Sequence, residues 1–159
     1  MNWSINDTEL IYKNKIVKGK LLKVESTIPV NIEIAWDRVR RSSTLQFVAK
    51  GMMTFRPLGN GFPEYWEVGK KAKTRTYLWG LIPMGGIHTI TFQKIDRCTY
   101  TLQTSESDFT AKVWNHTIIL EVVDETSIRY KDHIEIFAGW LTGVVAWWAK
   151  HFYIHRQQR

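Results

Sequence analysis

The chain of 159 residues carries 22 basic and 15 acidic side chains, which gives a formal net charge of +7. A composition of 44% hydrophobic and 23% charged residues is typical of a globular protein and excludes a disordered or low-complexity chain. The single cysteine, Cys98, excludes an intrachain disulfide and a zinc site built from several cysteines. The length suits one domain, so we expect residues 1–159 to form a single domain.

The sequence does not indicate secretion, a membrane span or nucleic-acid binding. The first residues lack the apolar stretch of a secretory signal, and the uncharged segment 136–149 is shorter than the roughly 20 residues of a membrane-spanning helix. We therefore expect a cytoplasmic protein with no spanning segment. The basic residues form several loose clusters without a nucleic-acid motif, so we expect a solvated surface and no nucleic-acid partner.

The first third of the chain predicts one strand followed by two short helices. Residues 20–28 alternate loosely and end at Pro29, which suits a strand. The apolar residues that follow at helical spacing are Ile32, Ala35, Trp36 and Val39. Ser42 or Ser43 is a suitable N-cap for a second short helix.

From residue 50 onward, the pattern favours strands. The predicted strands are residues 50–56, 71–79, 87–94, 99–104, 113–123 and 127–136. Most connections have hairpin length, which indicates antiparallel pairing because parallel strands need long crossovers.

Residues 139 to about 156 form the one long predicted helix. One apolar stripe consists of Leu141, Val145, Trp148 and Phe152, and a second consists of Trp140, Val144 and Trp147. The basic C-terminal end of this helix, which includes His151, His155 and Arg156, is expected to be solvated. A helix this apolar needs wide cover, and a curved sheet provides it most simply. The predicted fold is therefore an α+β helix-grip fold, in which an antiparallel sheet of about seven strands wraps around the C-terminal helix, with two short helices after strand 1.

This order of elements resembles the START and pollen-allergen-like (SRPBCC) superfamily. The segments that carry the resemblance are Ile28-Pro-Val-Asn-Ile-Glu-Ile-Ala-Trp36, Trp79-Gly-Leu-Ile-Pro-Met-Gly85, Trp114-Asn-His116, Tyr130-Lys-Asp-His-Ile-Glu-Ile136 and Phe152-Tyr-Ile-His-Arg-Gln-Gln158. They are similar to a bacterial subgroup of polyketide-cyclase or ligand-binding type, and the likeness covers about residues 20–158. The resemblance implies a deep cavity between sheet and long helix that holds lipids, sterols or polyketides. Some members catalyse cyclisation or dehydration there, and many only bind.

Strand alternation places two polar residues, His116 and Asp132, on the inner face of the sheet. A three-residue loop at 124–126 pairs Ile118 with Asp132 and His116 with Ile134, so His116 and Asp132 are diagonal neighbours. A buried carboxylate needs a partner, and histidine supplies one. Our hypothesis is that Asp132 fixes the His116 ring and leaves its other nitrogen for a ligand oxygen. The alternatives are a pair that only completes the core and a true acid–base dyad.

Further residues are candidates for the cavity wall. His88 shares the apparent face of Ile90 and Phe92 and therefore joins the candidate site. The aromatic wall candidates are Trp114, Tyr130, Trp148 and Phe152, for which ordinary core packing is the competing interpretation. No ligand spacing indicates a metal, and we expect none. Loops 59–69 and 80–86 are candidates for the cavity mouth, and whether loop 80–86 gates the cavity or contacts a partner stays open.

The expected function is binding of a small hydrophobic molecule, such as a lipid, sterol or polyketide-like compound, without a cofactor. One alternative is a cyclase- or dehydratase-type enzyme with His116 as proton shuttle and Asp132 as its orienting partner. Another is an interaction module that uses the Trp-rich helix to form a homodimer or to touch a membrane surface. We favour binding over catalysis, because no residue beside the pair is typical of an activated nucleophile.

Overall fold

The computed structural model describes residues 1–108 and 110–159. The strands are β1 (Asn2–Tyr12), β2 (Lys15–Ile28), β3 (Met53–Pro57), β4 (Lys71–Leu78), β5 (Ile82–Pro83), β6 (His88–Asp96), β7 (Thr101–Ser107), β8 (Val113–Asp124) and β9 (Ser127–Phe137). The helices are α1 (Ile32–Val39), α2 (Ser42–Ala49), a single 3₁₀ turn (Gly139–Leu141) and α3 (Thr142–Gln157).

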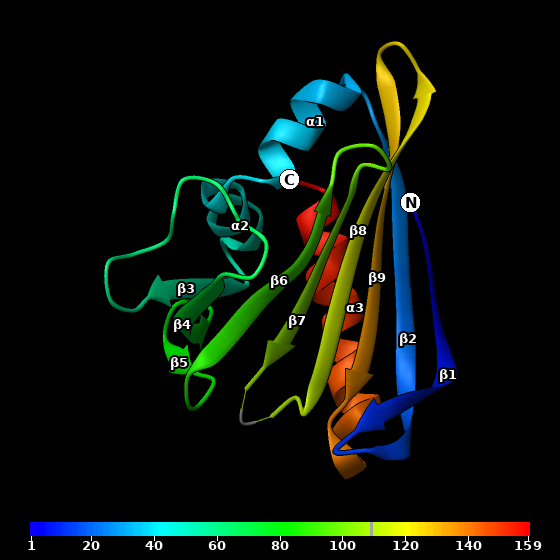
Figure 1. Ribbon diagram of the computed structural model, residues 1–159. Coiled ribbons are helices and arrows are strands. Elements are labelled where there is room, and N and C mark those ends of the chain that lie inside the picture. Colours follow the sequence, from blue (N-terminus) through cyan, green and yellow to red (C-terminus); the bar gives the residue numbers. More distant parts are fainter. Residues whose placement is uncertain (109) are drawn as a thin grey trace.

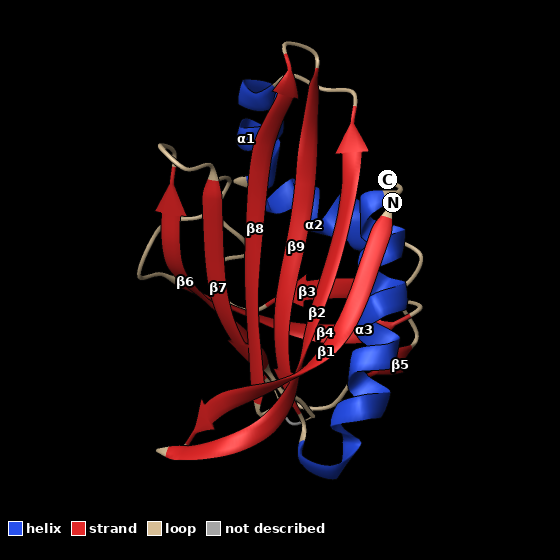
Figure 2. Cartoon of the chain, turned by 90° about the vertical axis from the view of Figure 1, so that its right-hand side faces the viewer, coloured by secondary structure: helices blue, strands red, loops and turns tan. Residues whose placement is uncertain are grey.

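All the strands belong to one curved antiparallel sheet. Their order is β1-β2-β9-β8-β7-β6-β4-β3, with β5 paired to β4. Figure 1 shows this sheet curling around α3, with α1 and α2 at one end of the molecule. In Figure 2, the strands from β8 to β1 run side by side along α3. The predicted α+β helix-grip fold is thus confirmed.

Over the described residues the sheet has nine strands, more than the sequence predicted, because β1 and the short β5 join it. The predicted first strand is therefore β2, and the two short helices come after it. In β1 only Leu10 is buried, so this strand has almost no apolar face to reveal it. It is held at the sheet edge by backbone pairing with β2 along its whole length.

The start of α1 is set by a side-chain cap, whereas the start of α2 is not. Asn31 precedes α1 and accepts a hydrogen bond from the Glu33 backbone N–H at 2.9 Å. For α2, the predicted serine cap is wrong, because Arg41 occupies the N-cap position without capping through its side chain. Arg41 is held extended there by a β-bridge to Tyr65. The Ser42 backbone N–H donates to the Glu64 carbonyl at 3.1 Å, which replaces the expected cap.

The two apolar stripes of the C-terminal helical segment, which consists of the 3₁₀ turn and α3, have different surroundings. Ala146 and Ala149 are completely buried and let the helix approach the sheet closely. The stripe that contains Trp148 and Phe152 packs against the hydrophobic core between the helix and the sheet. In the second stripe, Trp140 is 91% exposed and Trp147 is 58% exposed. Association through this exposed stripe, with a second copy or a membrane surface, stays a prediction.

We expect Gly19→Ala to destabilise the protein, because a Cβ at this position of β2 would lie 2.5 Å from Leu10 Cδ1 and 2.8 Å from the Ile136 carbonyl oxygen. Strain of this kind should lower the free energy of unfolding by about 1–3 kcal/mol. The matched control is Gly143→Ala in the first turn of α3, where an added Cβ meets no atom within 4 Å. Alanine there should stabilise the helix by up to about 1 kcal/mol. Urea denaturation measures both, and equal midpoints for the two variants would contradict the prediction.

Candidate functional site

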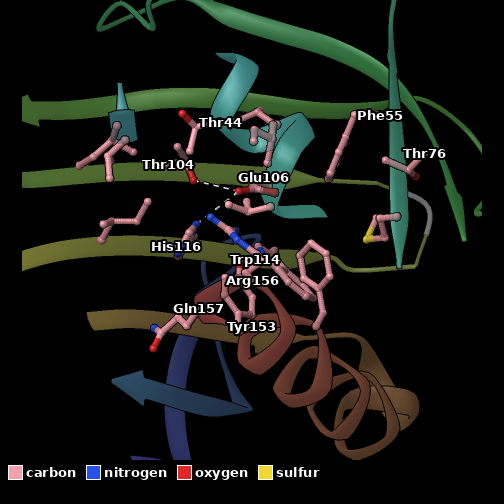
Figure 3. Close-up of a pocket in the computed structure, with 18 of the residues that line it drawn as sticks. Thr44, Phe55, Thr76, Thr104, Glu106, Trp114, His116, Tyr153, Arg156 and Gln157 are labelled. Atoms are coloured by element: carbon pink, nitrogen blue, oxygen red, sulfur yellow. Dashed lines mark hydrogen bonds and ion pairs between the residues drawn. The ribbon is translucent and has the colours of Figure 1, made fainter. Parts of the chain in front are cut away.

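A cavity of about 1250 Å³ lies between the sheet, α3 and the two short helices. Most of its wall is apolar, and the side chains come from both hydrophobic clusters of the core. A volume of this size exceeds the roughly 300–1000 Å³ of common small-molecule sites. The polar groups of the wall come chiefly from β6, β7, β8 and the last turn of α3, and Figure 3 shows several of them.

The predicted site residues lie on or directly behind this wall. The residues that line the cavity are His88, Trp114, His116, Tyr130, Trp148 and Phe152. Asp132 does not line it, because its side chain is fully buried behind His116. Whether these residues bind a ligand stays a prediction.

The pairing of β8 and β9 brings His116 and Asp132 together. His116 lies opposite Ile134 and Ile118 lies opposite Asp132, as the strand pattern predicted. The connection is shorter than the predicted three-residue loop, since Asp124 already pairs with Ser127. An irregularity after Val122 absorbs the difference and keeps the register.

His116 and Asp132 form a short buried hydrogen bond, with His116 Nε2 and Asp132 Oδ1 2.6 Å apart. Burial raises the pKa of Asp132, but the hydrogen bond from His116 and the charge of Arg156 together outweigh burial. The net effect is a lowered pKa, so the carboxylate is ionised. An ionised carboxylate only accepts hydrogen bonds, so Nε2 of His116 carries the hydrogen. The other ring nitrogen, Nδ1, lies 4.0 Å from Glu106 Oε1. Figure 3 shows His116 and Glu106 facing each other from neighbouring strands.

His88 lies between two carboxylates that the sequence interpretation did not assign to the site. Its Nε2 is 2.9 Å from Glu106 Oε2, and its Nδ1 is 3.2 Å from Asp108 Oδ2. Burial lowers the pKa of His88, but the hydrogen bonds and charges of Asp108 and Glu106 outweigh burial and raise the pKa to about 9. His88 is therefore an imidazolium that donates to both carboxylates at neutral pH.

The sequence pattern does not assign Glu106 and Asp108 to the site, because the predicted strand 99–104 ends before them. In the structure, β7 continues to Ser107, and Leu102, Thr104 and Glu106 succeed one another on its inner face. The two-residue alternation of β7 could have identified Glu106, if the strand had been extended past its last apolar residue. The C-terminal end of β7 carries polar residues where an apolar residue would be expected, so a search for hydrophobic alternation does not detect it.

Arg156 lines the cavity, so the expected fully solvated helix end is wrong for this residue. The last turn of α3 lies against the sheet, where Gln157 Nε2 donates to the Val24 carbonyl at 3.0 Å and to Asp132 Oδ2 at 2.9 Å. The Arg156 guanidinium carbon lies 4.9 Å from the centre of the Tyr153 ring. Figure 3 shows Arg156 and Tyr153 near His116, whereas Gln157 points toward β9.

The two predicted mouth loops differ in their packing. In loop 59–69, Trp66 is buried and stacks on Phe92 with ring centres 4.5 Å apart, so this part of the loop forms wall. In loop 80–86, Met84 lines the cavity, whereas Leu81 is 82% exposed. Gating or partner contact by this second loop stays a prediction.

Within the described part of the chain, no group of three or more histidine, cysteine or acidic side chains is arranged to hold a metal ion. Among the helices formed by residues 1–108 and 110–159, none is both long and apolar enough to cross a membrane.

Comparison with known proteins identifies the fold through structure alone. No protein-family model matches the sequence, and no curated protein matches it. A START superfamily protein from Mycobacterium smegmatis superposes with a TM-score of 0.64 at 7% identity, covering 87% of this chain and 92% of that one. Norcoclaurine synthase from Thalictrum flavum gives 0.59 at 11% identity, with 87% and 84% covered. The protein Ara h 8.0201 gives 0.57 at 17% identity, with 87% and 95% covered. The chain therefore shares the helix-grip fold of these structures.

Proposed function

We propose that this protein binds a small, mainly apolar molecule with at least one polar group in the cavity beside α3. The observation that carries the proposal is a large apolar cavity whose few polar groups are held in a fixed network. Entry of an apolar ligand into such a cavity lowers the free energy by about 25 cal/mol per Å² of apolar surface removed from water. The polar groups then select and orient the ligand. A lipid, sterol or polyketide-like compound fits this description.

The structural neighbours support small-molecule binding as a use of this fold. One structure of the Thalictrum flavum norcoclaurine synthase is a complex with dopamine and hydroxybenzaldehyde. At 10% identity, the ligands of that enzyme do not transfer to this chain, because fold alone does not determine function. The choice of ligand class here therefore rests on the cavity's own side chains.

A second candidate function is acid–base catalysis of a cyclase or dehydratase type. The observation that favours it is the short bond from His116 to the ionised Asp132, which orients the ring as in enzymes that use histidine to move protons. Among the described residues, however, no serine, threonine or cysteine hydrogen-bonds to His116. We therefore keep binding as the proposed function and catalysis as its alternative.

Native mass spectrometry of freshly purified protein should detect a retained small molecule at one copy per chain. Affinity for the neutral fluorescent probe N-phenyl-1-naphthylamine should fall about tenfold in Trp148→Ala, because Trp148 forms part of the wall. The matched control is Trp140→Ala, which removes an exposed tryptophan of the same helical segment and should leave the affinity unchanged. The proposed function would be contradicted if the protein retained no natural molecule and did not bind the probe.

His116→Ala should lower the free energy of unfolding by about 3–5 kcal/mol, because it deprives the buried, ionised Asp132 carboxylate of a short hydrogen bond and leaves its charge uncompensated. Asp132→Asn should cost about 1–3 kcal/mol, since the amide keeps the size but loses the charge. The control is His133→Ala, which changes a half-buried histidine on the other face of β9. If ligand affinity falls in the first two variants beyond the loss of stability, the pair anchors the ligand. Unchanged stability and unchanged affinity in both would show that the pair has no role.

Stability should decrease as the pH rises from about 6.5 to 9, because the pKa of His88 is raised to about 9 in the folded protein and is about 6.5 in the unfolded chain. The stabilisation from protonated His88 is complete below about pH 6.5 and is lost as the pH rises through 9. The loss should be about 3 kcal/mol in urea denaturation across this range. His88→Gln should remove most of this slope, and an equal slope in both proteins would contradict the assignment.

A further inference from the structure

The two acidic residues of the cavity wall already have their partners. Glu106 accepts from His88 Nε2 at 2.9 Å and from the Thr104 hydroxyl at 3.0 Å. Asp108 accepts from His88 Nδ1 at 3.2 Å and from the backbone N–H groups of Thr110 and Ala111, both at 2.7 Å. One histidine therefore engages both carboxylates, and a cationic ligand would have to displace it.

Among the described residues, the guanidinium of Arg156 has no carboxylate in direct contact, although the charges of Asp132 and Glu106 and the hydroxyl of Tyr130 act on it. Among residues 1–108 and 110–159, no carboxylate oxygen lies within 4.0 Å of its nitrogen atoms. Its Nε is buried and has no hydrogen-bond acceptor. The neighbouring Asp132 carboxylate is occupied on both oxygens, by His116 and by Gln157. Partly buried charges normally have a direct counter-charge, because desolvation is costly.

The position of Arg156 is fixed before any ligand arrives. Its guanidinium carbon lies 4.9 Å from the centre of the Tyr153 ring, and Tyr153 is itself fully buried. Gln157, the next residue, anchors the last turn of α3 to β2 and β9. A guanidinium held in place loses little further freedom when it forms two parallel hydrogen bonds.

We propose that the cavity ligand carries a carboxylate that Arg156 binds, with the apolar part of the ligand along the hydrophobic wall. The inference rests on the proposed function, because it names the polar group of that same ligand. A carboxylate matches the fork of the guanidinium and forms charge-assisted hydrogen bonds with it. Two exposed arginines, Arg38 and Arg159, also line the cavity, and the formal net charge of +7 favours the approach of an anion.

The test compares three molecules with the same 12-carbon chain: dodecanoate, dodecanol and dodecylamine. Each displaces N-phenyl-1-naphthylamine from the protein at pH 8, where the carboxylic acid is ionised in solution. The wild-type protein should bind dodecanoate at least about tenfold more tightly than dodecanol, and dodecylamine least tightly. Arg156→Gln should remove the preference for dodecanoate while changing the affinity for dodecanol less than about twofold.

Two further variants separate charge from recognition. Arg129→Gln makes the same change of net charge on an exposed strand position that does not line the cavity, and it should keep the wild-type preference. Arg156→Lys keeps the charge without the planar fork, and it should keep only part of the preference. If Arg156→Gln does not fold by circular dichroism, Arg156→Lys and the wild-type comparison decide the question.

Equal affinity of the wild-type protein for dodecanoate and dodecanol would overturn the carboxylate inference and leave the proposed function intact. A preference for dodecylamine, or a preference for dodecanoate that persists in Arg156→Gln, would overturn it as well. Failure of the probe and all three amphiphiles to bind would instead contradict the proposed function, and the carboxylate inference with it.

Discussion

The close approach of α3 to the sheet is the constraint on which the rest of the structure depends. It occurs where side chains are small, at Ala146 and Ala149, both of which are completely buried. Larger side chains at these positions would hold the helix away from β2, because interiors are close-packed. The wide side chains of α3, Trp148 and Phe152, instead border the cavity. The same helix is therefore fixed to the sheet along one face and leaves a space beside it.

A second consequence of this packing is that the polar groups of the cavity are organised before a ligand binds. The last turn of α3 reaches β9, where Gln157 and His116 share the two oxygens of Asp132. On the neighbouring strands, His88 joins Glu106 to Asp108. Hydrogen bonds in such a low-dielectric site are stronger than in water, and unpaired groups are correspondingly costly. The network therefore keeps the strands of the wall in place and restricts which polar group a ligand can bring.

Strand period and register account for most of the features that could be predicted from the sequence. Inner and outer faces of β8 and β9 result from alternation, and the diagonal placement of His116 and Asp132 results from the short connection between these strands. The outcome is insensitive to the exact turn, because an irregularity after Val122 compensates for a shorter loop. Local pattern is sufficient here because one face of each strand is buried.

The features that the sequence did not predict depend on contacts between distant segments. Strand β1 is stabilised by its backbone pairing with β2, which leaves no apolar pattern to detect. Glu106 is largely shielded from solvent because His88 on the next strand stabilises its charge, and neither residue alone indicates this. Arg156 belongs to a basic run that is typical of a solvated helix end, and only the docking of α3 brings it to the cavity. The sequence around a charged residue does not indicate which distant residue will compensate its charge when it is buried.

The chemistry available to the site favours recognition over covalent reaction. Thr104, the hydroxyl residue opposite His116 across β7 and β8, donates its hydrogen to Glu106 and is not activated by the histidine. The lone cysteine, Cys98, is exposed. The Nδ1 atom of His116 faces Glu106 across 4.0 Å, which exceeds hydrogen-bond length. A ligand hydroxyl or water could bridge this gap, and any acid–base step would then act on the bound molecule itself. Binding of a polar ligand group is thus the first requirement of both the carrier and the catalytic interpretation, and Arg156 offers a buried Nε that has no hydrogen-bond acceptor within the described part of the chain.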